Sequence, residues 1–172
     1  MFHLSQWLIL VLFSLSVSAS VAAEGSVSDA NTTCNFDSQK QIAVDYQQLQ
    51  LPAGRKANTV VPYGKVWAPG GKPLTLFTNT PLSIAGKNMA DGAYTMFVVP
   101  EEKSWTLIIS KSTDISGKYD EANDLVRVPM QFGKLPQAET AFTAYFAHVA
   151  TDQCNLRLDV GKDRAWVVFQ RK

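Results

Sequence analysis

The sequence predicts an all-β protein: an antiparallel β-sandwich, jelly-roll-like, with about eight to ten strands and one disulfide. Two observations carry this prediction. Apolar and polar side chains alternate with a period of two in many short runs, the pattern of strands with one buried face. Turns rich in glycine and proline separate these runs, as they do in sandwiches and barrels.

The expected strands can be placed from this alternation. Residues 94–99 and 105–109 are apolar on both faces and lie either side of a short polar loop, so we expect a central, buried hairpin. A second hairpin is predicted from residues 156–160 to 165–169. The remaining expected strands centre on residues 42–46, 74–76 and 126–130.

Residues 138–150 fit two patterns. Phe142, Phe146 and Val149 follow a helical spacing, and alanine is abundant. Phe142, Ala144 and Phe146 also alternate with less apolar neighbours. The residues alone leave helix and strand open for this segment.

The N-terminus predicts a secretory signal peptide over residues 1–23. An apolar run at 7–15 is followed by small residues, with Val21 and Ala23 at the −3 and −1 positions before Glu24. The alternative is an uncleaved anchor, but the run is short beside the roughly 20 residues of a bilayer span. We expect export to the periplasm or the extracellular space, with no membrane association after cleavage. Residues 24–33 are small and polar, predicting a disordered lead-in to a β-sandwich domain over 34–172.

Composition excludes several classes of function. With 46% hydrophobic and 18% charged residues, this 172-residue chain is not disordered by composition. Its 16 basic and 15 acidic residues leave a net charge of +1, without the basic excess of a nucleic-acid-binding protein. Two Cys and two His are too few for the usual multi-Cys/His zinc sites, and signal cleavage leaves only His148. We expect no metal, no cofactor and no nucleic-acid partner.

Cys34 and Cys154 are the two cysteines of the chain. An even number in an oxidising compartment favours a disulfide. Such a bridge would close nearly the whole domain, and chain entropy alone would contribute about 5 kcal/mol. The competing interpretations are a nucleophilic cysteine, for which His148 is the sole candidate base, and an intermolecular bridge.

Several motifs resemble a bacterial exported family known as domain of unknown function 2911. The block 61–67 (VPYGKVW) carries the resemblance together with Tyr119 and the acidic run after it, and further similarity extends over roughly residues 34–170. The resemblance implies a β-rich fold, a strand at 141–147 and pairing of Cys34 with Cys154. It implies no activity. The sequence departs from the family pattern at 68–73 (APGGKP), where the family usually has an Arg followed by a Gly-Ala-Asn-Glu run.

The candidate ligand-binding residues are Arg55, Lys56, Tyr63, Lys65 and Trp67. Aromatic rings beside cations can stack a sugar or hold an anionic group. The competing interpretation is structural: Trp67 fills the core and Lys65 points to water.

Four carboxylates form an acidic segment that could hold Ca²⁺ in an oxygen cage. Its spacing lacks the EF-hand pattern, and the simpler interpretation is a solvated loop in which Asp124 or Glu121 pairs with Arg127. The segment comprises Asp114, Asp120, Glu121 and Asp124.

The leading functional hypothesis is a non-catalytic module that binds a small molecule, a glycan or a protein. Neither a nucleophile elbow nor a phosphate-binding glycine loop occurs in the sequence. The first alternative is a hydrolase that uses carboxylates or a bound metal, and the second is a structural envelope protein. A pocket with two carboxylates would favour the hydrolase, and an exposed aromatic patch near Tyr63 would favour binding.

Overall fold

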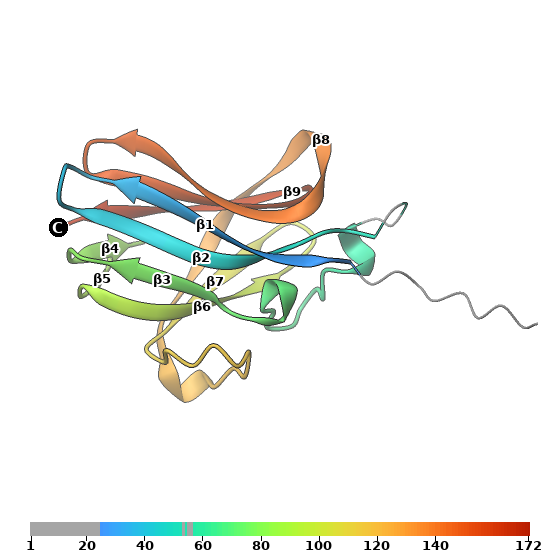
Figure 1. Ribbon diagram of the computed structural model, residues 1–172, viewed down its shortest axis with the longest axis horizontal. Helices are drawn as coiled ribbons and strands as arrows, with labels where there is room; N and C mark the ends of the chain where they lie inside the picture. Colours follow the sequence, from blue (N-terminus) through green and yellow to red (C-terminus); the bar gives the residue numbers. More distant parts are fainter. Residues whose placement is uncertain (1–24, 53, 55–56) are drawn as a thin grey trace, which may run out of the picture.

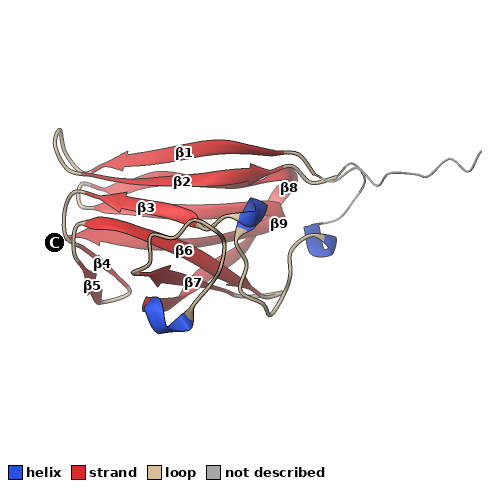
Figure 2. Ribbon diagram, turned by 60° about the horizontal axis from the view of Figure 1, so that its bottom comes forward, coloured by secondary structure: helices blue, strands red, loops and turns tan. Residues whose placement is uncertain are grey.

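The computed structural model describes residues 25–52, 54 and 57–172 and is built almost entirely of strands (Figures 1 and 2). The strands are β1 (Val27–Asn35), β2 (Gln41–Leu49), β3 (Leu74–Thr78), β4 (Leu82–Ile84), β5 (Lys87–Met89), β6 (Gly92–Pro100), β7 (Trp105–Ser110), β8 (Asp124–Ala150) and β9 (Gln153–Arg171). Short 3₁₀ turns lie at η1 (Ala57–Thr59), η2 (Pro69–Gly71) and η3 (Glu121–Asn123).

The nine strands form one open antiparallel sheet in the order β1-β2-β3-β6-β7-β8-β9-β4-β5. Strands adjacent in sequence are mostly adjacent in the sheet, and Figure 2 shows β1, β2, β3, β6 and β7 in succession. The exception is the small β4–β5 hairpin, which pairs with the end of β9. The predicted all-β antiparallel fold with eight to ten strands is confirmed.

The predicted central hairpin is β6–β7. Its register runs from Thr95 opposite Ser110 to Pro100 opposite Trp105. Most residues of both strands are buried, because each of their faces is covered by other parts of the protein. The apolar character of both faces is therefore a reliable sign of a central position.

β9 reverses direction within its length. A straight strand of 19 residues would hold its ends about 60 Å apart. Instead, the Arg171 N–H donates to the carbonyl of Asp152, 2.8 Å away, immediately before the strand begins. Figure 1 shows β9 running out and returning toward the C-terminus. Gly161, with φ +55°, lies at the reversal. The second predicted hairpin is wrong: both of its segments are strand, but residues 156–159 pair with 143–146 of β8 and residues 163–166 pair with 131–134 of β8, not with each other.

β8 bends together with β9. Its first part pairs with β7 and its later part pairs with β9, and the register of the β8–β9 pair shifts between Lys134 and Glu139. Residues 138–150 are strand, as the family resemblance implied. The helical pattern is wrong because Phe142 and Ala144 point inward while Val149 is exposed.

The bend carries the later part of β8 across the core to β1 and β2. The Phe146 N–H donates to Thr32 Oγ1 at 3.0 Å, and the rings of Tyr46 and Phe142 meet edge to face at 6.0 Å. The sheet thus curls round a single apolar core, which is how a sandwich covers the inner faces of its strands.

The disulfide between Cys34 and Cys154 is formed and links β1 to β9. Both side chains are buried in the core. Of the alternatives that the sequence left open, the intramolecular bridge is the one present.

The prediction of a disordered lead-in over 24–33 is wrong for residues 27–33, which belong to β1. Their polar side chains gave no strand signal, but β1 pairs with β2 over nine consecutive positions. The backbone supplies these hydrogen bonds whatever the side chains are. The predicted signal peptide lies outside the described residues. Among the residues that are described, no helix has the length and apolar character needed to cross a bilayer.

Candidate functional site

The block 61–67 runs along the end of β6 and is held there by its backbone. Trp67 exchanges two hydrogen bonds with Val98, at 2.7 and 3.1 Å, and the Gly64 N–H donates to the carbonyl of Pro100 at 2.9 Å. Gly64 has φ +73°, a conformation that favours glycine. This path points the side chains of the block in different directions.

Trp67 is a core residue. Its ring lies edge to face with Trp105 at 6.3 Å and with Phe142 at 5.5 Å, and the side chain is buried. Lys65, two residues earlier, is exposed. The structural interpretation of Trp67 and Lys65 therefore holds. Arg55 and Lys56 lie outside the described residues.

Tyr63 is placed differently from its neighbours in the block. Its hydroxyl donates to Asp163 Oδ2 at 3.0 Å, across 100 residues of sequence. Lys134 Nζ donates to the other oxygen, Asp163 Oδ1, and forms an ion pair with it. Asp163 is only 5% exposed, so its charge is held by these two partners rather than by bulk water.

The protonated form of Tyr63 is strongly favoured. Burial, the hydrogen bond to Asp163 and the negative charge of that carboxylate raise the pKa of Tyr63 to about 12. A second carboxylate, Glu102, adds to the effect. Tyr63 is therefore a hydroxyl donor throughout the physiological pH range.

These residues line a hollow of about 710 Å³ at the end of the molecule where β8 and β9 bend. We call it the end pocket. It lies between η1, the β6–β7 loop and the reversal of β9, and Leu51, Ala57 and Ala138 supply apolar lining. Six of its residues are charged, with the signs balanced: Lys103, Lys134, Lys162, Glu102, Glu139 and Asp163.

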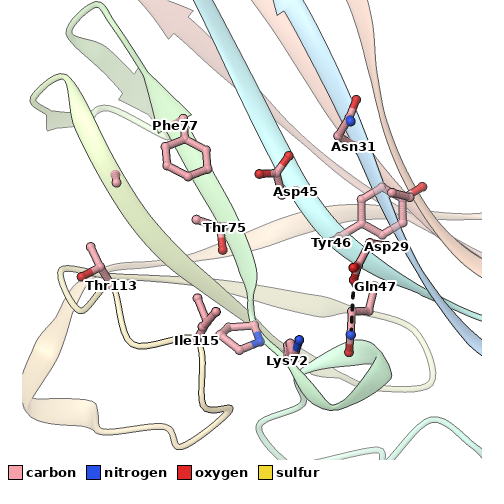
Figure 3. Close-up of a pocket in the computed structure, with 13 residues that line it drawn as sticks. Asp29, Asn31, Asp45, Tyr46, Gln47, Lys72, Thr75, Phe77, Thr113 and Ile115 are labelled. Carbon is pink, nitrogen blue, oxygen red and sulfur yellow. Dashed lines mark hydrogen bonds between the residues drawn. The ribbon is translucent and has the colours of Figure 1, made fainter.

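A second hollow, of about 620 Å³, lies on the outer face of β1, β2 and β3 (Figure 3). We call it the face pocket. Phe77 and Ile115 line it, together with Asp29, Asp45 and Lys72. The close-up shows Asp45 between Asn31 and Phe77, while Ile115 and Lys72 lie at the opposite end.

The acidic segment is a structured loop. Arg127 Nε donates to Asp124 Oδ2 at 2.6 Å, Tyr119 donates to the same oxygen at 2.9 Å, and Glu121 lies 3.9 Å from the guanidinium. Asp120 caps η3 through the Ala122 N–H. Within the described residues, no three His, Cys, Asp or Glu side chains gather to hold a metal ion. The predicted pairing with Arg127 is confirmed.

Sequence reasoning missed Asp163 and Lys134. Neither lies in a motif, and they meet Tyr63 only because β8 and β9 bend at the same place. Asp159 was missed for a similar reason: it is 2% exposed and forms a two-pronged ion pair with Arg164 across the fold of β9. The one signal in the sequence was a charged residue on each side of Gly161, namely Asp159 before it and Asp163 after it. His148 lies exposed near the end of β8 and lines neither pocket.

Comparison with known families gives one match. Residues 28–168 fit the model of a family described as a protein of unknown function, DUF2911. The chain belongs to the DUF2911 family. No curated protein and no solved structure matches it. Membership of DUF2911 therefore identifies the family of the chain but assigns it no activity.

Both pockets lie within the residues that match the DUF2911 model. The lining of the face pocket runs from Asp29 to Ile115 and that of the end pocket from Leu51 to Asp163. The family match therefore covers both pockets and favours neither as the functional site.

Proposed function

We propose that the protein is a non-catalytic, exported binding module that takes a small polar molecule, with glycans as the first class to test, in the end pocket. The observation that carries the proposal is the buried Asp163, held by Tyr63 and Lys134 on the wall of a 710 Å³ hollow. Ligand pockets commonly have volumes of about 300–1,000 Å³ and a few fixed polar groups on partly apolar walls.

The polar groups of the end pocket are suited to binding. Tyr63, Lys134 and Asp163 fix one another's orientation, and preorganised groups reduce the entropy lost when a ligand is ordered. In the described part of the chain, Lys103, Lys162, Glu102 and Glu139 form no ion pair. Their donors and acceptors can therefore meet hydroxyl or amide groups of a ligand.

A hydrolase is the second candidate for the same pocket, because three carboxylates line it. A glycosidase needs one carboxyl group free to give a proton and another free to attack or to activate water. Both oxygens of Asp163 are already hydrogen-bonded, one to Lys134 and one to Tyr63. This arrangement supports an anchoring role for Asp163 and leaves Glu102 and Glu139 as the pair that such a reaction would use.

The test is ligand-observed NMR with a panel of neutral mono- and disaccharides. We expect saturation transfer to at least one sugar class, and we expect Tyr63→Phe to weaken it about tenfold, the effect of losing one well-placed hydrogen bond. Tyr94→Phe is the matched control, because its hydroxyl donates to the carbonyl of Ala90, outside the end pocket. Equal binding by the two variants, or no transfer to any sugar, would contradict the proposal.

Export is tested separately. We expect the mature protein, recovered from the organism that makes it, to begin at Glu24. Intact-mass measurement of the secreted or periplasmic fraction checks the cleavage site. Recovery of the full-length chain in a membrane fraction would support the uncleaved anchor instead.

A further inference from the structure

The face pocket gathers apolar side chains that are exposed without a partner. Four large hydrophobic residues are exposed in the described part of the chain, and two of them, Phe77 (43%) and Ile115 (53%), line this pocket. Grouped apolar exposure of this kind marks an interaction site more often than single exposed residues do.

The wall that carries Ile115 is held in place by local hydrogen bonds. The Ser116 N–H donates to Asp114 Oδ1 at 2.8 Å, and the Asp114 N–H donates to Ser112 Oγ at 3.1 Å. At Gly117, an added Cβ would lie 2.5 Å from the carbonyl oxygen of Gly71, which shows how closely this loop packs on η2. The pocket is therefore formed before any ligand enters.

The opposite wall carries an excess of negative charge. Asn31 lies opposite Asp45 and Asp29 lies opposite Gln47 in the β1–β2 register, so the two carboxylates occupy diagonal positions, about 7–8 Å apart. Gln47 Nε2 reaches Asp29 at 3.4 Å, while Asp45 forms no ion pair with any described residue. The one lysine of the pocket, Lys72, lies toward the far end from Asp45 (Figure 3).

We propose that the face pocket is a second ligand site, specific for a small organic cation: an apolar body carrying an ammonium or guanidinium group. The apolar body would lie against Phe77 and Ile115, and the cationic group would pair with Asp45. Such a ligand relieves the repulsion between Asp29 and Asp45 and covers the exposed apolar surface at the same time. The site is independent of the end pocket, with which it shares no lining residue.

The experiment is a titration of the ¹⁵N-labelled protein with 2-phenylethylamine at low salt, followed by ¹H–¹⁵N NMR. We expect shift changes in residues 29–31, 45–47, 75–77 and 113–115. The comparison ligand is 3-phenylpropionate, which has the same ring and the opposite charge, and we expect it to bind at least tenfold more weakly. Raising the NaCl concentration to 0.5 M should weaken amine binding, because exposed charges are screened.

Two variants test the contacts, and two others serve as controls. Asp45→Asn should weaken amine binding about tenfold, and Phe77→Ser should weaken both ligands. Glu101→Gln, an exposed carboxylate outside the pocket, is the matched control and should change nothing. Tyr63→Phe should also leave amine binding unchanged. A failure of this proposal can therefore be distinguished from a failure of the proposed function of the end pocket.

Several outcomes would overturn the proposal. Equal affinity for the amine and the carboxylate would remove the role of charge, and so would an Asp45→Asn variant that binds normally. Shifts confined to the end pocket would place the ligand elsewhere. Binding of a capped Phe-Lys peptide without binding of the free amine would assign the surface to a protein partner instead.

Discussion

At the scale of single residues, the ion pair in the end pocket is asymmetric. The Asp163 side chain is 7% exposed, whereas that of Lys134 is 60% exposed. Desolvation therefore falls mainly on the carboxylate, and the cost of breaking the pair depends on which partner is removed.

We predict that Lys134→Met lowers the free energy of unfolding more than Asp163→Asn does. The first variant leaves a buried carboxylate with only Tyr63 as partner and should cost about 2 kcal/mol. The second leaves a lysine that water can solvate and should cost about 1 kcal/mol. Urea denaturation at pH 7 measures both values. Equal losses, or a larger loss for Asp163→Asn, would show that the burial of Asp163 does not determine the cost of breaking the ion pair.

Tyr63 yields a prediction about alkaline pH. Its folded-state pKa is about 12, above the usual value of 10. The folded protein therefore retains a proton that the unfolded chain loses, and the contribution of Tyr63 to stability is complete below pH 10 and falls away between about pH 10 and 12. In denaturation curves over this range, Tyr63→Phe should lose less stability with rising pH than the parent does. Parallel slopes for the two proteins would refute the assignment.

At the scale of the elements, the reversal of β9 depends on Gly161. It has φ +55°, and a Cβ added there would lie 2.5 Å from the Cβ of Ala57. The turn thus needs glycine twice over, for its backbone conformation and for the close approach of η1.

We predict that Gly161→Ala lowers the free energy of unfolding by about 3 kcal/mol, from backbone strain and steric overlap together. Gly86→Ala is the matched control: Gly86 has φ +77° in open space, so it should cost only the strain, about 1 kcal/mol. Adding Ala57→Gly to Gly161→Ala should recover part of the loss. A Gly161→Ala variant no less stable than Gly86→Ala would exclude the contact as a constraint.

The elements also show what the sequence could predict. Alternating apolar residues located β2 and β3, because one-sided burial leaves that period in the sequence. Runs that are apolar on both faces located β6 and β7, because both faces of these strands are buried. β1 gave no such signal, since its pairing with β2 relies on backbone groups. In 138–150 the two periods coincided, and only the packing of Phe142 against Tyr46 and Trp67 distinguishes them.

At the scale of the whole molecule, the pockets depend on contacts between distant segments. Tyr63 could be selected from the sequence as an aromatic residue among cations, but its partner lies 100 residues away. That partner is set by the shared bend of β8 and β9, which no local pattern encodes. The face pocket similarly requires the register of three strands and the position of a loop more than 60 residues from β2.

The disulfide is the constraint that acts on the molecule as a whole. It joins β1 to β9 across 120 positions of sequence, so it restricts the unfolded chain over most of its length. A loop of this size corresponds to about 5 kcal/mol in the chain-entropy model. β1 lies at one end of the strand order, so the bridge also ties a terminal strand to the far side of the core.

We predict that reducing the disulfide lowers the free energy of unfolding by up to about 5 kcal/mol and exposes the amides of residues 27–35 to hydrogen exchange before those of β6 and β7. The oxidised and reduced forms of the same chain are the right comparison, because Cys34→Ala/Cys154→Ala would also remove buried sulfur atoms from the core. Denaturation of both forms gives the cross-link contribution, and the double variant then gives the packing contribution by difference. The prediction would be wrong if the reduced and oxidised proteins unfolded at the same urea concentration and the amides of β1 were equally protected from exchange in both. That result would show that pairing with β2 and packing against β8 are enough to hold β1 in place without the disulfide.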